Sequence, residues 1–314
     1  MITKYEDPRD ATFEELYKLA KSNNDLIVLT ADTGARKFED FEKNIPDQFY
    51  NVGISEQNAI SVASGMSSVG KKVFVFAIGC FITSRCYEQI KIDICCMNRS
   101  VTIIGMGTGY GYAGDGPTHH ITEDLSIMRC FPNLNIWSPS DCQSLSYAIN
   151  ESYKNNTPNY IRFDKSLFND IYDVNHDFSL GVDKIREGSD ITIVSTSLMT
   201  TRALSISSLL KERNINVGVV DIHRIKPLNE DVLFELLKGS KKILVLDENN
   251  IYGGLCGLIS EFICKRSLFI PVKLCGIPDV YRFVSGSRDY LLKLDGLDED
   301  SIVKSILEWE DNDI

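Results

Sequence analysis

Glu56 has the sequence surroundings of a residue that can exchange a proton with a ligand. It follows a short apolar stretch, 49–54, and opens a segment of small residues that is typical of a buried helix, with Ser55 as the predicted N-cap. Two interpretations are open at this point. The carboxylate can stabilise the start of the helix through the helix dipole, or it can lie buried and share a proton with a nitrogen of a bound molecule.

A second group of candidate residues lies in the glycine-rich segment Gly114–His120, which reads GDGPTHH. Glycine, proline and aspartate favour turns, so a turn without catalytic function explains the pattern by itself. The same segment places Asp115 and His119 four residues apart. Histidine titrates near neutral pH and can act as a general acid or base. The pattern is therefore compatible with catalysis but does not establish it.

Aromatic and basic residues form the third group. Phe81, Arg85 and Tyr87 fall within one predicted helix, and Arg162 lies in a predicted strand. Aromatic residues at helical spacing usually belong to the core. Each arginine can form an ion pair or bind an anionic group of a ligand. The residues alone leave these alternatives open.

The three groups together resemble motifs of the transketolase family of thiamine-diphosphate enzymes. The sequence GISEQN around Glu56 is similar to the family's pyrimidine-binding motif, and GDGPTHH is similar to the DGPTH segment that lines its substrate channel. The resemblance implies that Glu56 is catalytic and hydrogen-bonds a ring nitrogen of the cofactor's aminopyrimidine. It also implies that Asp115 and His119 contact hydroxyl groups of a sugar and that His119 assists proton transfer.

The resemblance assigns roles to the third group as well. It implies that Phe81 and Tyr87 border the pyrimidine ring, where stacking and the exclusion of water favour the uncharged form of the ring. Arg85 and Arg162 resemble arginines that related enzymes use near the phosphate of the substrate. We therefore expect Phe81 and Tyr87 in the cofactor site, and Arg85 and Arg162 in the substrate site.

The family's diphosphate–magnesium motif has no matching segment in this sequence. That motif also begins with GDG, but it needs a later asparagine pair, and Asn155–Asn156 falls at the end of a polar helix or in a linker. The resemblance starts near residue 10, and the domain that precedes this region in single-chain transketolases is missing. We therefore expect the smaller subunit of a split transketolase, with Met1 as its native start and a partner chain that carries the diphosphate-binding domain.

The elements that position these residues follow a strand–helix alternation. This alternation predicts mainly parallel sheets with helices on both faces. The polar, aperiodic stretch 166–188 interrupts it and is predicted to be a linker. The predicted fold class is therefore α/β with two doubly wound domains, over 1–165 and 189–314. The resemblance implies that the first is a pyrimidine-binding domain and the second a transketolase C-terminal domain. The predicted strands are 25–30, 71–78, 100–106, 134–137, 159–163, 191–195, 217–222, 243–247 and 272–275. The predicted helices are 55–70, 81–97, 123–130, 142–154, 201–213, 230–238, 255–265 and 299–310.

Composition argues against several functional classes. The chain has 33 Lys and Arg against 44 Asp and Glu, which gives a net charge of −11, and such a surface repels nucleic acid. The N-terminal residues are polar and the longest apolar runs are of strand length, so we expect neither a signal peptide nor a membrane span. The nine cysteines are odd in number and mostly fall within apolar patterns. This favours buried, reduced thiols in a cytoplasmic protein.

The function expected from the resemblance is ketol transfer. A two-carbon unit would pass from a ketose phosphate to an aldose, with thiamine diphosphate and Mg²⁺ as cofactors, the Mg²⁺ ligands on the partner chain, and an α2β2 assembly. The alternatives are the beta subunit of a 2-oxoacid dehydrogenase decarboxylase component, an enzyme similar to 1-deoxyxylulose 5-phosphate synthase, and a non-catalytic chain that only binds a partner. The presence of Glu56, Asp115 and His119 together argues against the last.

Overall fold

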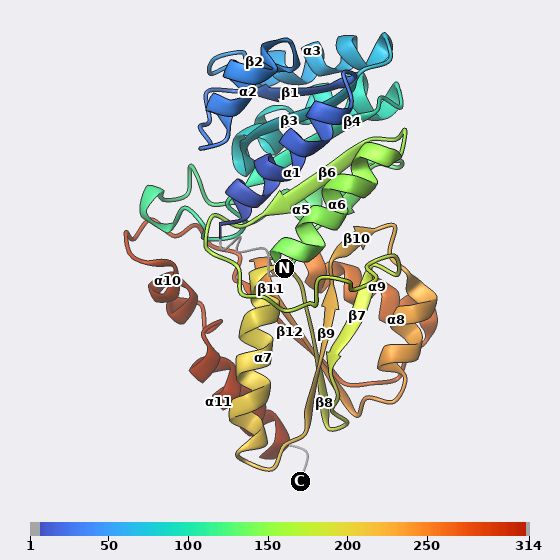
Figure 1. Ribbon diagram of the computed structural model, residues 1–314. Coiled ribbons are helices and arrows are strands. Elements are labelled where there is room, and N and C mark those ends of the chain that lie inside the picture. The colour runs from blue at the N-terminus through green and yellow to red at the C-terminus, as the bar shows by residue number, and fades with distance from the viewer. Residues whose placement is uncertain (1–6, 312–314) are drawn as a thin grey trace. The chain divides into compact units, whose positions relative to one another are not determined.

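The computed structural model describes residues 7–311, which divide into two compact units. The first unit contains residues 7–108, 127–176 and 224–227. The second unit contains Gly109–Ser126, Asp177–His223 and 228–311. Each unit is built on one mainly parallel sheet with helices packed against it (Figure 1). The predicted α/β fold class is therefore confirmed.

The sheet of the first unit has seven strands in the order β10-β5-β6-β4-β3-β1-β2. All neighbouring strands are parallel except β10 and β5. The strands are β1 (Leu26–Thr30), β2 (Phe49–Asn51), β3 (Lys72–Ile78), β4 (Val101–Met106), β5 (Asn135–Trp137), β6 (Asn159–Phe163) and β10 (Arg224–Lys226). The helices that precede residue 176 are α1 (Pro8–Ser22), α2 (Phe38–Asn44), α3 (Glu56–Ser68), α4 (Tyr87–Gln89), α5 (Asp124–Met128) and α6 (Cys142–Lys154).

Helix α1 was not among the predicted elements, although its start carries clear signals. Asp7 caps the helix by accepting hydrogen bonds from the backbone N–H groups of Arg9 and Asp10, and Pro8 occupies the first helical position. The ring of Phe13 packs edge-on against Phe76 of β3, with the ring centroids 4.8 Å apart. The helix is thus held by the core of the first unit.

The predicted helix over 81–97 forms with unusually wide turns. Phe81–Arg85 and Ile90–Cys96 are π-helical, and α4 lies between them. Turns of this kind are rare and frequently occur at functional sites. Three of the predicted site residues, Phe81, Arg85 and Tyr87, lie in this helix. The wide turns therefore change the directions in which their side chains leave the helix.

The sheet of the second unit has five strands in the order β12-β11-β8-β9-β7, all parallel to their neighbours except β7. The strands are β7 (Val182–Arg186), β8 (Ile191–Ser195), β9 (Val217–Ile222), β11 (Lys242–Asn250) and β12 (Val272–Ile277). The helices are α7 (Leu198–Lys211), α8 (Glu230–Leu237), α9 (Gly254–Arg266), α10 (Arg288–Leu294) and α11 (Glu299–Asp311).

Two strands correct the sequence-based assignment. β7 lies inside the stretch 166–188, which is therefore not wholly a linker. Only Val182 of β7 is buried and its other residues are half-buried, because an edge strand has one neighbour and need not be apolar on both faces. β10 pairs antiparallel with β5 of the first unit, with Arg224 opposite Trp137. Such a pairing between distant segments leaves no local pattern.

Two findings bear on the expectations drawn from composition. Within residues 7–311, no helix is long and apolar enough to cross a membrane. All nine cysteines are free thiols. Five of them are buried, namely Cys86, Cys95, Cys142, Cys256 and Cys275.

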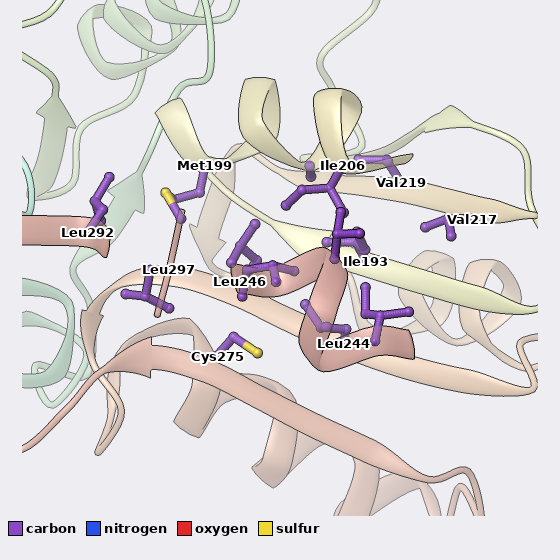
Figure 2. Packing of buried hydrophobic residues seen from close by; sticks show 14 of the residues in the cluster. Ile193, Met199, Ile206, Val217, Val219, Leu244, Leu246, Cys275, Leu292 and Leu297 are labelled. Carbon is purple, nitrogen blue, oxygen red and sulfur yellow. The ribbon is translucent and has the colours of Figure 1, made fainter. Parts of the chain in front are cut away.

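One apolar cluster forms the core of the second unit (Figure 2). It joins Met199 and Ile206 of α7 to strands β8, β9 and β11, and it includes Leu244 of β11. Tyr110 and Ala113, from the segment that follows β4, belong to the same cluster. The burial of these two residues explains why Gly109–Ser126 is part of the second unit rather than the first.

We predict that Leu244→Ala destabilises the second unit by about 2–5 kcal/mol, because the missing side chain removes buried apolar surface and leaves a cavity. Urea denaturation followed by circular dichroism measures the change. The matched control is Leu294→Ala, at a leucine that is 46% exposed and should cost no more than about 0.5 kcal/mol. Equal costs for the two variants would contradict this description of the core.

Candidate active site

Glu56 is the first residue of α3, and its side chain lies on the buried face of that helix. The chain reaches α3 from Asn51, whose side-chain oxygen accepts a hydrogen bond from the backbone N–H of Gly53 at 3.0 Å. Gly53 has a φ of +73°, a conformation that favours glycine. The buried residues of α3 are Glu56, Ala59, Ile60 and Ala63. This spacing is that of a single helix face, so the helix directs Glu56 toward the interior.

Arg85 is the hydrogen-bond partner of the Glu56 carboxylate. Its Nη1 donates to Oε2 of Glu56 at 2.6 Å. Only 4% of the Glu56 side chain is exposed, compared with 43% of the Arg85 side chain. Within residues 7–311, Oε1 of Glu56 has no hydrogen-bond partner. The site therefore presents a buried carboxylate with one oxygen held and the other available.

Phe81 completes this cluster. The guanidinium carbon of Arg85 lies 4.3 Å from the centroid of the Phe81 ring, a favourable cation–π geometry. Helix α3 makes two hydrogen bonds to the helical segment on which Phe81 and Arg85 lie. The side chain of Gln57 donates to the backbone oxygen of Arg85 at 3.2 Å, and the Ser61 hydroxyl donates to the Asp93 carboxylate at 2.7 Å. These contacts fix the position of Arg85 beside Glu56.

Tyr87 borders a cavity and lies apart from the cluster of Glu56, Arg85 and Phe81. Its hydroxyl donates to the backbone oxygen of Ile127 at 3.3 Å, and its ring centroid lies 4.7 Å from that of Phe131. Burial raises the pKa of the Tyr87 hydroxyl. The cavity has a volume of about 490 Å³ and is lined by Tyr87, Lys91, Cys95, Cys96, Cys130, Phe131, Pro132 and Asn133. Glu56 and Phe81 are not part of this lining.

Arg162 lies in the interior of the first unit. It is 2% exposed and belongs to β6, all of whose residues are buried. Its Nη1 donates to the hydroxyl of Ser138 at 3.3 Å. The two arginines predicted for the substrate site thus differ sharply in accessibility, since Arg85 is partly exposed and Arg162 is enclosed by protein.

Asp115 and His119 share one loop of the second unit. Asp115 is exposed and ends a short 3-10 turn, Ala113–Asp115. His119 is half-buried, and its backbone N–H donates to the oxygen of Gly116 at 2.9 Å. Its Nδ1 lies 2.9 Å from the hydroxyl of Thr118. The loop therefore presents a carboxylate and an imidazole that are both accessible to a ligand.

His120 is a candidate that the sequence analysis did not single out. It is 5% exposed, and its Nε2 is buried without a hydrogen-bond partner within residues 7–311. Its ring packs edge-on against Tyr110 at a centroid distance of 4.8 Å. Burial lowers the pKa of the imidazole, which favours its neutral form. The only signal in the sequence was the doubled histidine of GDGPTHH.

The two units thus hold two chemically different clusters. The first unit brings together Glu56, Arg85 and Phe81, a group that can exchange a proton with a ligand nitrogen next to an aromatic face. The second unit brings together Asp115 and His119, a group that can hydrogen-bond hydroxyl groups and transfer protons. Within residues 7–311, no group of three or more His, Cys, Asp or Glu side chains could hold a metal ion.

Comparison with known proteins identifies the family. The profile of the transketolase pyrimidine-binding domain matches residues 7–170, and the profile of the transketolase C-terminal domain matches residues 181–302. The chain is 30% identical to a protein of Phocaeicola vulgatus that is named as a subunit of apulose-4-phosphate transketolase, in an alignment that covers 96% of each chain. It is also 30% identical to 1-deoxy-D-xylulose-5-phosphate synthase of Clostridium acetobutylicum, of which it covers 50%.

A solved structure gives the same result for the whole chain. That structure, described as a split gene transketolase in an inactive beta4 tetramer, superposes with a TM-score of 0.85 at 30% sequence identity. The superposition covers 96% of this chain and 97% of the other. The two domain profiles, the relative from Phocaeicola vulgatus and the superposed structure all point to one family. This chain therefore belongs to the transketolase family, whose members depend on thiamine diphosphate.

Proposed function

We propose that this chain is one subunit of a split transketolase that transfers a two-carbon ketol unit from a ketose phosphate to an aldose. The observation that carries the proposal is the cluster in which buried Glu56 keeps one free oxygen beside Arg85 and Phe81. The relative from Phocaeicola vulgatus, named as a transketolase subunit, supports it over nearly the full length of both chains.

The residues of this cluster fit the pyrimidine end of thiamine diphosphate. An aminopyrimidine offers a ring nitrogen for hydrogen bonding and a flat face for stacking, and the cluster offers a buried carboxylate oxygen next to a phenyl ring. When bound, thiamine diphosphate supplies a nucleophilic carbon that can carry a two-carbon unit. The part of Glu56 is to share a proton with the ring nitrogen through Oε1, because Arg85 already holds Oε2.

The remaining assignments follow the same proposal. Asp115 and His119 hydrogen-bond sugar hydroxyls, and their accessibility in one loop supports this. Arg85 and Arg162 are proposed phosphate ligands. The partial exposure of Arg85 supports this role, because a phosphate in solvent can reach its guanidinium group. The burial of Arg162 gives its role no such support, because a phosphate would have to enter the interior of the first unit to contact it. Tyr87 is proposed to border the cofactor from the helix that also carries Phe81 and Arg85.

A partner chain is part of the proposal. It would carry the diphosphate-binding domain and the Mg²⁺ ligands, and two copies of each chain would form an α2β2 assembly in the cytoplasm. The description of the split gene transketolase as an inactive tetramer of one subunit type supports the need for a second kind of subunit. Closed two-fold symmetry is the usual way to build such an assembly.

A second candidate is an activity like that of 1-deoxy-D-xylulose-5-phosphate synthase. The relative from Clostridium acetobutylicum favours it, with 30% identity over 98% of this chain. This chain covers only 50% of that relative, whereas its alignment with the transketolase subunit covers 96% of each chain. Assays of the assembled complex with ketose phosphates and, separately, with 2-oxoacids distinguish the two candidates and also test the 2-oxoacid dehydrogenase alternative.

We predict that Glu56→Gln slows proton–deuterium exchange at the thiazolium carbon by about a hundred- to ten-thousand-fold in the assembled complex. Glutamine has nearly the size of glutamate and keeps hydrogen-bonding atoms, but it cannot share a proton in the same way. Exchange followed by NMR after rapid quenching measures the effect. The matched control is Asp115→Asn, which should reduce sugar turnover and leave this exchange unchanged. Exchange at the wild-type rate in Glu56→Gln would remove the basis of the proposed function.

We predict that the isolated chain binds thiamine diphosphate and Mg²⁺ weakly, because hard oxygen ligands and a diphosphate site are expected on the partner. Isothermal titration calorimetry, with and without the partner chain, measures the difference. Tight binding by this chain alone would contradict a divided site.

We predict that the co-expressed subunits form a complex with two copies of each chain. Light scattering coupled to size-exclusion chromatography gives the mass. A complex that contains only one copy of each chain across the accessible concentration range would contradict the α2β2 assembly.

A further inference from the structure

The loop that carries Asp115 and His119 is closed at its base by a pair of backbone hydrogen bonds. The backbone N–H and oxygen of Gly109 pair with those of Ile121, both at 2.9 Å. Beyond this base, Asp115 and Thr118 are exposed. Tyr110 and Ala113, between the base and Asp115, are buried in the core of the second unit, so contacts at the start of the loop can set the position of the exposed part.

Glu248, near the end of β11, provides such a contact. Its Oε1 accepts a hydrogen bond from the backbone N–H of Tyr110 at 2.9 Å, although the two residues are 138 positions apart. A Cβ placed on Gly109 would lie 2.5 Å from Cγ and Cδ of Glu248, and Gly109 has a φ of +56°. The glutamate side chain thus packs directly against the first residue of the loop, where only glycine leaves room for it.

Arg288 of α10 holds this glutamate in place. Its Nε lies 2.9 Å and 3.1 Å from the two carboxylate oxygens of Glu248, and its Nη2 also contacts Oε2. The side chains are only 5% and 11% exposed for Glu248 and Arg288. A buried carboxylate is stable when it is paired and fully hydrogen-bonded. Arg288 and the N–H of Tyr110 together supply these bonds.

Neighbouring residues of β11 hold the other end of the loop. The backbone N–H of Asn250 donates to the oxygen of Thr122 at 2.6 Å. The side-chain amide of Asn249 donates to the carboxylate of Asp124 at 2.9 Å. Three consecutive residues, Glu248 to Asn250, therefore bind both sides of the loop's base. Tyr110 has a second anchor, because its hydroxyl donates to Asp295 at 2.6 Å.

We propose that Glu248, held by Arg288, is a positioning residue that orders the loop and thereby sets the geometry of Asp115 and His119. The consequence for catalysis rests on the function proposed above for these two residues. Glu248 acts through the backbone of Tyr110, which precedes Asp115 by five residues and His119 by nine. A small displacement of a reacting group is enough to reduce a rate strongly.

The test uses the full-length chain in complex with its partner and compares Glu248→Gln, Arg288→Gln and the double variant. Hydrogen–deuterium exchange of peptides that cover 109–122 measures loop order without reference to activity. Turnover of a ketose phosphate gives kcat and KM, and exchange at the thiazolium carbon reports the cofactor site. The matched control is Glu299→Gln, which breaks a contact with Arg202 in the same unit and does not touch the loop.

We expect both single variants to lose protection within 109–122 and to lower kcat by about ten- to a hundred-fold, while exchange at the thiazolium carbon is unchanged. The double variant should be less impaired than the sum of the single variants, because it leaves no unpaired buried charge. Glu299→Gln should retain protection in 109–122 and wild-type turnover.

Wild-type protection of 109–122 in both single variants would overturn the proposal, and so would a loss of protection spread evenly over the second unit. If the wild-type complex turned over no ketose phosphate, the proposed function would fail. In that case, a loss of protection confined to 109–122 would still support Glu248 as the residue that orders the loop. Loss of order without any change in kcat or KM would overturn the positioning role.

Discussion

The pairing of buried carboxylates with arginines is the interaction on which both clusters depend. Glu56 is held by Arg85, and Glu248 is held by Arg288. Removing Arg288 would leave Glu248 as an uncompensated buried charge, which costs about 3–5 kcal/mol. Solvent screens the pair of Glu56 with Arg85 more strongly, because the Arg85 side chain is 43% exposed. Each pair therefore restrains the segments that contribute to it. In the first unit these are α3 and the helix that begins at Phe81, and in the second unit they are β11 and α10.

The fold class could be predicted because strands in the middle of a parallel sheet are buried on both faces. β1, β4 and β8 are buried along their whole length, so their sequences read as nearly continuous apolar runs. Glu56 could be singled out for a related reason. Glu56 shares one face of α3 with Ala59, Ile60 and Ala63, which are buried, and this helical spacing can be read from the sequence.

The features that could not be predicted depend on partners that are distant in the sequence. The apolar run before Glu248 ends at Leu246 and is followed by four polar residues, 247–250. This pattern predicts that the strand ends before Glu248. β11 instead continues to Asn250, and its polar residues Asp247 to Asn249 are buried. They are buried because groups far away in the chain satisfy their hydrogen bonds, as the N–H of Tyr110 does for Glu248. β10 could not be predicted for the same reason, because it exists through its pairing with β5, which is distant in the sequence.

The topology of the first sheet explains why the residues of the first cluster meet. The carboxyl ends of parallel strands lie along one edge of a sheet, and ligands of open α/β sheets bind outside that edge. Glu56 follows the carboxyl end of β2, and Phe81 follows that of β3, with β1 between the two strands. The chain leaves the same edge after β4 to form the loop of Asp115 and His119. Strand order thus brings the Glu56 carboxylate and the Phe81 ring together. The loop of Asp115 and His119 packs in the second unit instead, so it requires a separate anchor, which β11 provides through Glu248.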